Sequence, residues 1–259
     1  MEVGVAVVGE GAAVALGDSG AGEVSPVVER EEGSDMARMT VDDFAAQLTE
    51  ALGPRLATLL LYGSAARHPA EAAAAMNTLL IVRADGGSMD AGLFGKLAEP
   101  VRKWIASGHP PPLMMTDREW RDSADAFAIE YEDIREAHRV LAGRDPWAGI
   151  SVRREHIRRQ LEHELMGKLM HLRPAYAAYW SQPKRLAEVV RETRSSFLAM
   201  LRAVLRLSGR PAPAARDALV RDAAALIGFA PDRLAEPAAY LDAVTRTAEY
   251  VNRMERNPS

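Results

Sequence analysis

Apolar residues in the first half of the chain are spaced first as in a helix and then as in strands. After Thr40, a favourable helix N-cap, apolar residues recur three or four positions apart: Val41, Phe44, Leu48 and Leu52. This spacing predicts a one-sided helix that ends near Gly53 and Pro54. Two short apolar runs follow, at 57–62 and 78–82, each bounded by turn-forming residues. They have the length of buried strands.

The next segment predicts a helix, a strand and two further short elements. Between residues 89 and 107 an apolar residue recurs at every fourth position: Leu93, Leu97, Val101 and Ile105. This pattern predicts a helix that stops at Gly108, and the apolar segment 113–115 predicts a third strand. Thr116 is a suitable cap for a short helix that reaches Trp120. In 127–134 apolar and acidic residues alternate, which is typical of a half-buried strand.

The pattern becomes helical throughout after a turn-rich boundary at 143–146. A helix that begins at Ser151 would carry one apolar stripe, made of Ile157, Leu161, Leu165, Leu169 and Leu172. Pro174 is expected to end or kink that helix, because proline lacks the backbone N–H that the helix needs. Further helices are predicted over 186–207, 214–227 and 237–254. Amphipathic helices joined by short loops predict a bundle.

These elements predict an α+β fold with two domains. A small mixed-sheet domain, residues 40–145, would precede an α-helical bundle, residues 146–259. Residues 1–39 are rich in small and acidic residues, and most of them lack periodicity, so they are predicted to form a mostly disordered tail. Met36 or Met39, just before the first predicted helix, is a candidate for the true start of translation.

Composition and charge narrow the classes of function. The 259 residues are 48% hydrophobic and 26% charged, as in a globular protein of one or two domains. A net charge of −4 argues against charge-driven binding to nucleic acid or to anionic membranes. The chain has no cysteine, which suits a cytoplasmic location. No apolar run is long enough to span a bilayer, and no Lys or Arg precedes the mildly apolar segment 3–16, so neither membrane insertion nor export is expected.

The segment 59–67 carries the main functional signal. It reads Leu-Leu-Leu-Tyr-Gly-Ser-Ala-Ala-Arg, so that an apolar strand runs into Gly63 and Ser64, and Arg67 follows three residues later. With its neighbouring elements, segment 40–145 resembles a nucleotidyltransferase domain of the polymerase-beta type, and 127–143 resembles a group of bacterial proteins described only as nucleotidyltransferase-like. The resemblance implies that Gly63 and Ser64 approach nucleotide phosphates, because glycine leaves room for a phosphate beside the backbone N–H groups. Arg67 would add positive charge.

The acidic residues of that family are missing here. In the family, two aspartates separated by one residue begin the second strand and hold magnesium ions on one face of the sheet. The corresponding residues are Ala75 and Asn77 or, in a register shifted by one, Met76 and Thr78. Neutral oxygens alone bind magnesium poorly, and the third strand offers no acid either. The resemblance therefore implies an impaired catalyst with no metal ligands and no catalytic residues, in which Asn77 joins the nucleotide-binding residues.

Three functions are compatible with this sequence. The first is a nucleotide-binding protein that holds a nucleoside triphosphate near Gly63 without transferring it. The second is an active nucleotidyltransferase, acting on a small molecule or a protein, in which Glu130 or another acid holds magnesium. The third is a regulatory module that binds a protein partner and has no working pocket.

Other motifs in the helical half have simpler interpretations. His163 and Glu164 begin like a zinc-protease motif, but Gly167 occupies the position of the second ligand. Four arginines near the start of the predicted helix would contact phosphate or RNA, but two acid–arginine pairs spaced four apart favour an ion-paired surface: Glu155 with Arg159, and Arg158 with Glu162. Core packing accounts for the nearby aromatics Tyr176, Tyr179 and Trp180.

Overall fold

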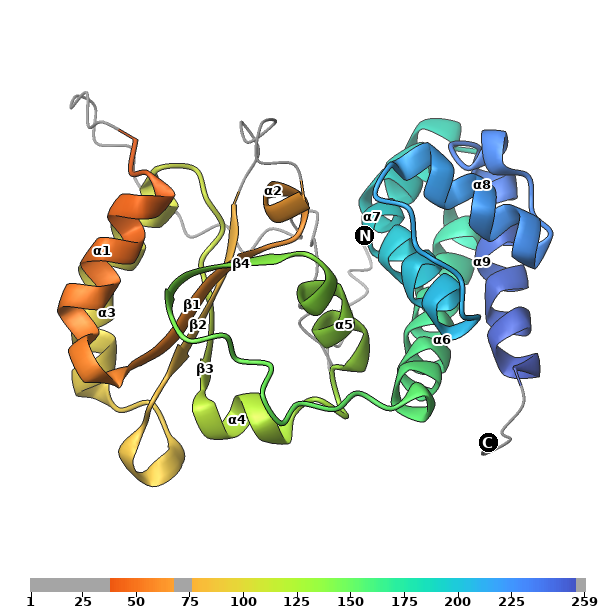
Figure 1. Cartoon of the computed structure of the whole chain (residues 1–259). Helices are drawn as coiled ribbons and strands as arrows, with labels where there is room; N and C mark the ends of the chain where they lie inside the picture. Colours follow the sequence, from red (N-terminus) through yellow and green to blue (C-terminus); the bar gives the residue numbers. More distant parts are fainter. Residues whose placement is uncertain (1–37, 68–75, 255–259) are drawn as a thin grey trace.

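The computed structural model describes residues 38–67 and 76–254, and it has an α+β architecture (Figure 1). Four strands form one sheet in the order β3-β2-β1-β4. These are β1 (Leu56–Tyr62), β2 (Asn77–Val82), β3 (Leu113–Thr116) and β4 (His138–Gly143). The central strand β1 is antiparallel to β2 and β4, whereas β2 and β3 are parallel. A small mixed sheet followed by helices confirms the predicted fold class.

Helices flank this sheet and then make up the rest of the described chain. In the sheet-containing half they are α1 (Val41–Leu52), α2 (Ser64–Arg67), α3 (Ala91–Ala106), α4 (Asp117–Asp122) and α5 (Ala128–Glu136). In the helical half they are α6 (Arg154–Tyr179), α7 (Pro183–Leu207), α8 (Arg216–Ile227) and α9 (Pro237–Arg253). Short 3-10 turns lie at Gly53–Arg55, Asp85–Gly87 and Pro231–Arg233.

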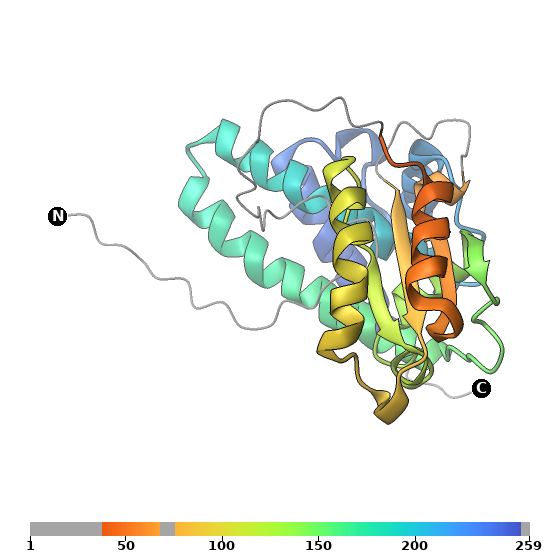
Figure 2. The same ribbon diagram turned by 90° about the vertical axis from the view of Figure 1, so that its left-hand side faces the viewer.

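Helices cover both faces of the sheet, which explains why β1 and β2 are apolar at nearly every position. Successive strand residues point to opposite faces, so Leu59 and Leu80 pack against α1 and α3, while Leu60 and Leu79 pack against Trp120 and its neighbours. Figure 2 shows α1 and α3 side by side across the first face. The second face is covered by α4 and α5, and α5 also lies between the sheet and the helical half (Figure 1).

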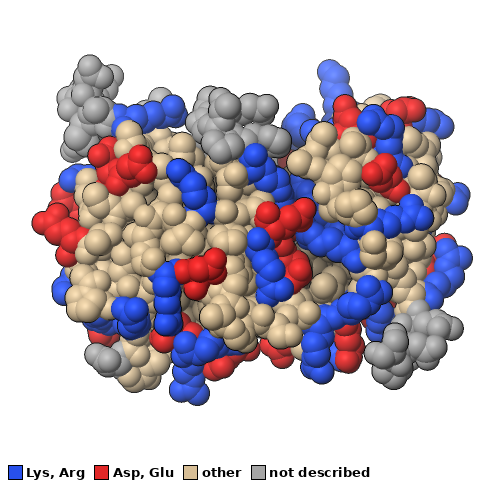
Figure 3. Space-filling view, in the orientation of Figure 1, with Lys and Arg blue, Asp and Glu red and all other residues tan. Residues whose placement is uncertain are grey.

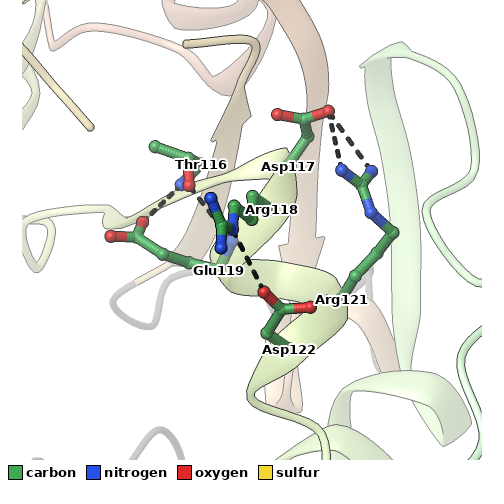
Figure 4. A network of polar contacts seen from close by, with 6 residues as sticks. All are labelled: Thr116, Asp117, Arg118, Glu119, Arg121 and Asp122. Carbon is green, nitrogen blue, oxygen red and sulfur yellow. Dashed lines mark hydrogen bonds and ion pairs between the residues drawn. The ribbon is translucent and has the colours of Figure 1, made fainter. Parts of the chain in front are cut away.

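Reciprocal capping boxes fix the starts of two helices where the sequence predicts caps. The Thr40 side chain accepts a hydrogen bond from the backbone of Asp43, whose carboxylate accepts one from the backbone of Thr40. At α4 the same exchange joins Thr116 and Glu119 (Figure 4). The exposed surface of α4 adds two ion pairs at helical spacing, Arg118 with Asp122 and Arg121 with Asp117.

The predicted strand at 127–134 is wrong, because this segment forms helix α5. Ile129 packs into the core of the helical half, whereas Tyr131 and Ile134 pack toward the sheet, where the Tyr131 ring stacks on Trp120. A helix that is buried on two opposite sides places apolar residues at alternate positions over a short stretch. The alternation of apolar and acidic residues in 127–134 therefore results from a helix that is buried on two sides.

The strand β4 lies in a segment where the pattern of apolar residues predicts no element. Its residues are mostly half-buried, and it pairs along β1 at the edge of the sheet. The periodicity of the short segment 138–143 is weak because an edge strand buries only part of each side chain. Pairing with the continuous apolar strand β1 supplies the order that the local sequence does not.

The helical half is organised around α6 and α7. The five residues of the predicted apolar stripe on α6 are all buried, which confirms that prediction. Of the two outcomes predicted for Pro174, an end or a kink, the end does not occur, since α6 runs through Pro174 to Tyr179. Tyr176, beyond the proline, is buried and its hydroxyl donates to the carbonyl of Pro237, so contacts with α9 hold the last turn in place.

The predicted tail lies almost wholly outside the described residues, because the description begins at Arg38. Met39 is buried against the core formed by α1 and α3. Within the described ranges, the helices are either too short or too polar to cross a lipid bilayer.

Candidate functional site

The turn that follows β1 has a backbone conformation that favours glycine. Gly63 has φ of +79°, and its N–H donates to the carbonyl of Ala137, the residue just before β4. Its own carbonyl accepts from the backbone of Ala66 and Arg67, which closes the single turn of α2. A side chain at position 63 would be strained in this left-handed conformation. The chain therefore turns sharply between the sheet and Ser64.

Sheet register places Asn77 beside that turn. Tyr62, the last residue of β1, pairs with Asn77, the first residue of β2. A Cβ added to Gly63 would lie 3.6 Å from the Asn77 Nδ2 atom, so the amide group borders the glycine directly. The Asn77 side chain is half-buried and makes no hydrogen bond to another described residue. The structure thus brings the predicted residues Gly63, Ser64 and Asn77 to one end of the sheet.

Ser64 and Arg67 complete the predicted set from the same short helical turn. Ser64 is exposed and Arg67 is half-buried. Among the described carboxylates, none lies within ion-pair distance of Arg67, in contrast to most of the arginines on α4 and α6. A guanidinium one turn away from Gly63, without a carboxylate partner in the described part of the chain, favours anions at this end of the sheet.

His109 positions the start of β2, and sequence reasoning missed it. Its ring stacks on Trp104 with centroids 4.0 Å apart, and its Nδ1 accepts from the N–H of Met76 at 3.4 Å. Burial, and secondarily the charge of Arg38, lower the pKa of His109, which favours the neutral ring that this contact requires. The only sequence signal was a histidine between Gly108 and a proline run.

The described side chains at this end of the sheet do not supply the oxygen ligands that magnesium prefers. Asn77 contributes an amide, and Thr78 is buried with a hydroxyl that has no hydrogen-bond partner among the described residues. Magnesium prefers carboxylate and phosphate oxygens. Across residues 38–67 and 76–254, no three His, Asp or Glu side chains are arranged to hold a metal ion.

Glu130, the acid of the enzyme hypothesis, lies on a helix and faces the helical half. Its Oε2 accepts from Gln160 Nε2 at 2.7 Å, while the Gln160 amide oxygen accepts from the N–H of Ile129 at 2.9 Å. Glu130 borders a cavity of about 490 Å³ between α5 and α6, which neither Gly63 nor Ser64 lines. The structure therefore does not bring this acid to the Gly63 turn. Burial raises the pKa of Glu130, and the hydrogen bond from Gln160 offsets this only in part.

Replacing Glu130 by glutamine is expected to raise the free energy of unfolding at pH 8 by on the order of 1 kcal/mol. The folded-state pKa is raised, so the folded protein binds more protons than the unfolded chain between the two pKa values. Stability of the wild type therefore falls as the pH rises through that window, and the neutral amide avoids this loss. Urea denaturation at pH 4 and pH 8 measures the difference.

The matched control is Glu249→Gln, which removes an exposed carboxylate from α9. This substitution should change stability little at either pH. A Glu130→Gln variant that is less stable than the wild type at pH 8, or equally affected at both pH values, would contradict the cause assigned to the shift.

The structure shows where the other sequence motifs of the helical half lie. The predicted pairs Glu155 with Arg159 and Arg158 with Glu162 both form, which confirms an ion-paired surface on α6. Core packing is correct for Tyr176 but wrong for Tyr179 and Trp180, whose exposed fractions are 37% and 74%. His163 is exposed at the cavity beside Glu130.

Comparison of the chain with models of known protein families and with curated proteins finds no match.

Proposed function

We propose that this chain is a nucleotide-binding protein with a nucleotidyltransferase-like domain, and that it holds the phosphates of a nucleoside triphosphate without transferring the nucleotide. The observation that carries the proposal is the arrangement around Gly63. A turn in the left-handed conformation lies beside the half-buried amide of Asn77, next to an exposed hydroxyl on Ser64 and the guanidinium of Arg67, which has no carboxylate partner among the described residues. These are donors and a positive charge, which suit phosphate oxygens.

The chemistry of the same residues favours binding over transfer. Two-metal catalysis needs acids that hold cations between the nucleotide and its acceptor. Ala75, Asn77 and Thr78 have no negative charge with which to hold these cations. Glu130 accepts a hydrogen bond from Gln160 on α6 and does not line the Gly63 turn. Binding through Ser64, Arg67 and Asn77 would therefore proceed without magnesium.

Calorimetric titration with ATP, GTP, CTP and UTP, with and without magnesium, tests this function. Binding is expected in the absence of magnesium. Because a hydrogen bond to a charged group contributes about 1.5–3 kcal/mol, Ser64→Ala, Arg67→Ala and Asn77→Ala should each weaken the affinity about tenfold or more. Assays of pyrophosphate release from the same nucleotides run in parallel.

Matched substitutions on the same domain are Ser88→Ala and Arg102→Ala, both at exposed positions. They should leave the affinity unchanged. Identical titration curves for the wild type, Ser64→Ala and Arg67→Ala would contradict the assignment of a nucleotide pocket to these residues. Magnesium-dependent release of pyrophosphate would instead support an active enzyme. If no nucleotide binds, the remaining hypothesis is a regulatory module that binds a protein partner.

A further inference from the structure

The helical half contains a cavity lined largely by arginines. It lies between α7 and α8 and has a volume of about 600 Å³. The basic residues that line it are Arg191, Arg194, Arg202 and Arg216. Among the described residues no carboxylate lines the cavity. Figure 3 shows Lys and Arg side chains gathered in a band that extends onto the helical half. The interior of this cavity is therefore strongly positive.

The positions of the arginines follow from helix geometry. Arg191, Arg194 and Arg202, together with Leu198, recur three or four residues apart on α7 and so share one face. Arg216 is the first residue of α8, and Ala215 before it provides no side-chain cap. The uncapped N–H groups of α8 add to the positive potential at this point.

Three of these arginines have no carboxylate partner in the described part of the chain. Among the described residues, no carboxylate lies within ion-pair distance of Arg191, Arg194 or Arg216, and Arg194 Nε is buried with no hydrogen-bond partner. Burial, and then the nearby charge of Arg216, lower the pKa of Arg194, while Tyr240 and Asp217 oppose this shift. Like charges at this spacing destabilise a helix, and an anion bound in the cavity would relieve that repulsion.

We propose that this cavity binds the diphosphate group of a small molecule. The planar guanidinium fork matches phosphate oxygens, and several arginines around one space can neutralise more charge than a single phosphate carries. The apolar side chains of Val190 and Leu198 line the same space and offer a surface to an uncharged part of the ligand. This site is distinct from the Gly63 turn, and it does not depend on nucleotide binding there.

Titration of the full chain with inorganic pyrophosphate and with ADP, without magnesium and at fixed ionic strength, tests the proposal. The wild type should bind pyrophosphate, and Arg194→Gln with Arg216→Gln should weaken the affinity by about tenfold or more per guanidinium removed. Equal affinity for both ligands would identify diphosphate itself as the recognised group. Tighter binding of ADP would show that a nucleoside contacts the apolar wall, and both results support the proposal.

The control removes the same number of charges from exposed ion pairs: Arg185→Gln with Arg246→Gln. This variant should bind pyrophosphate as the wild type does. The single variant Arg216→Gln serves if the double variant fails to fold, since Arg216 is exposed. Equal losses in both double variants, no binding by the wild type, or loss of binding in Arg67→Ala instead would each overturn the proposal. The last result would place the anion at the Gly63 turn.

Discussion

Replacing Arg206 by methionine is expected to lower the free energy of unfolding by about 3–5 kcal/mol, because it leaves buried negative charge without a partner. Arg206 on α7 forms ion pairs with Asp133 and Glu136 on α5, and the side chains of Arg206 and Asp133 are only 16% and 14% exposed. Burial opposes the charge on Arg206, but the two carboxylates outweigh it and raise the pKa of the guanidinium. Urea denaturation at pH 7, followed by circular dichroism, measures the loss.

Two further variants show whether that loss comes from the unpaired carboxylate. Arg246→Met breaks an exposed pair with Asp242 on α9, and it should change stability by less than about 0.5 kcal/mol. Adding Asp133→Asn to Arg206→Met should recover part of the loss, since it removes the stranded charge. The interpretation fails if Arg206→Met costs no more than Arg246→Met, or if the added substitution lowers stability further.

The elements that sequence predicts correctly are those buried on one side or on all sides. The stripe on α6 has a clear helical period because one face alone enters the core. The apolar runs of β1 and β2 are equally clear because helices cover both faces of the sheet. Local pattern is sufficient wherever burial is uniform along an element.

The errors occur where a segment contacts two different surroundings. Helix α5 separates the sheet from the helical half, so Ile129 and Tyr131 face different cores and imitate a strand. The partly buried edge strand β4 owes its conformation to pairing with β1. Both cases depend on contacts between distant parts of the chain, which no local window contains.

The sequence predicts which residues belong to the candidate site, but it does not predict the contacts that hold them in place. A glycine after a buried strand is readable from sequence, and so is the lack of acids near Asn77. The bond from Gly63 to the carbonyl of Ala137 and the contact of Met76 with His109 join residues far apart in the chain. The arginines that line the α7–α8 cavity come from two helices, so only the fold shows that they surround one space.

The second large effect is expected at Gly143, the last residue of β4, where Gly143→Ala should lower the free energy of unfolding by about 2–5 kcal/mol. Gly143 has φ of +80°, and a Cβ there would lie 2.3 Å from the carbonyl oxygen of Ala57. The left-handed conformation alone costs a residue with a side chain about 1–2 kcal/mol, and overpacking adds about 1–3 kcal/mol. The Ala57 backbone cannot move away easily, because β1 is held by strands on both its edges. Urea denaturation measures the change.

Gly149→Ala separates the two causes, since Gly149 has φ of +79° but a Cβ there would meet no atom within 4 Å. This control carries the same backbone strain without the collision, so it should cost only about 1–2 kcal/mol. The difference between the two variants then measures how closely β4 is pressed against β1. Equal losses would mean that the strand shifts to accept the methyl group, and the close approach of the Gly143 and Ala57 backbones would not be a constraint on this sheet.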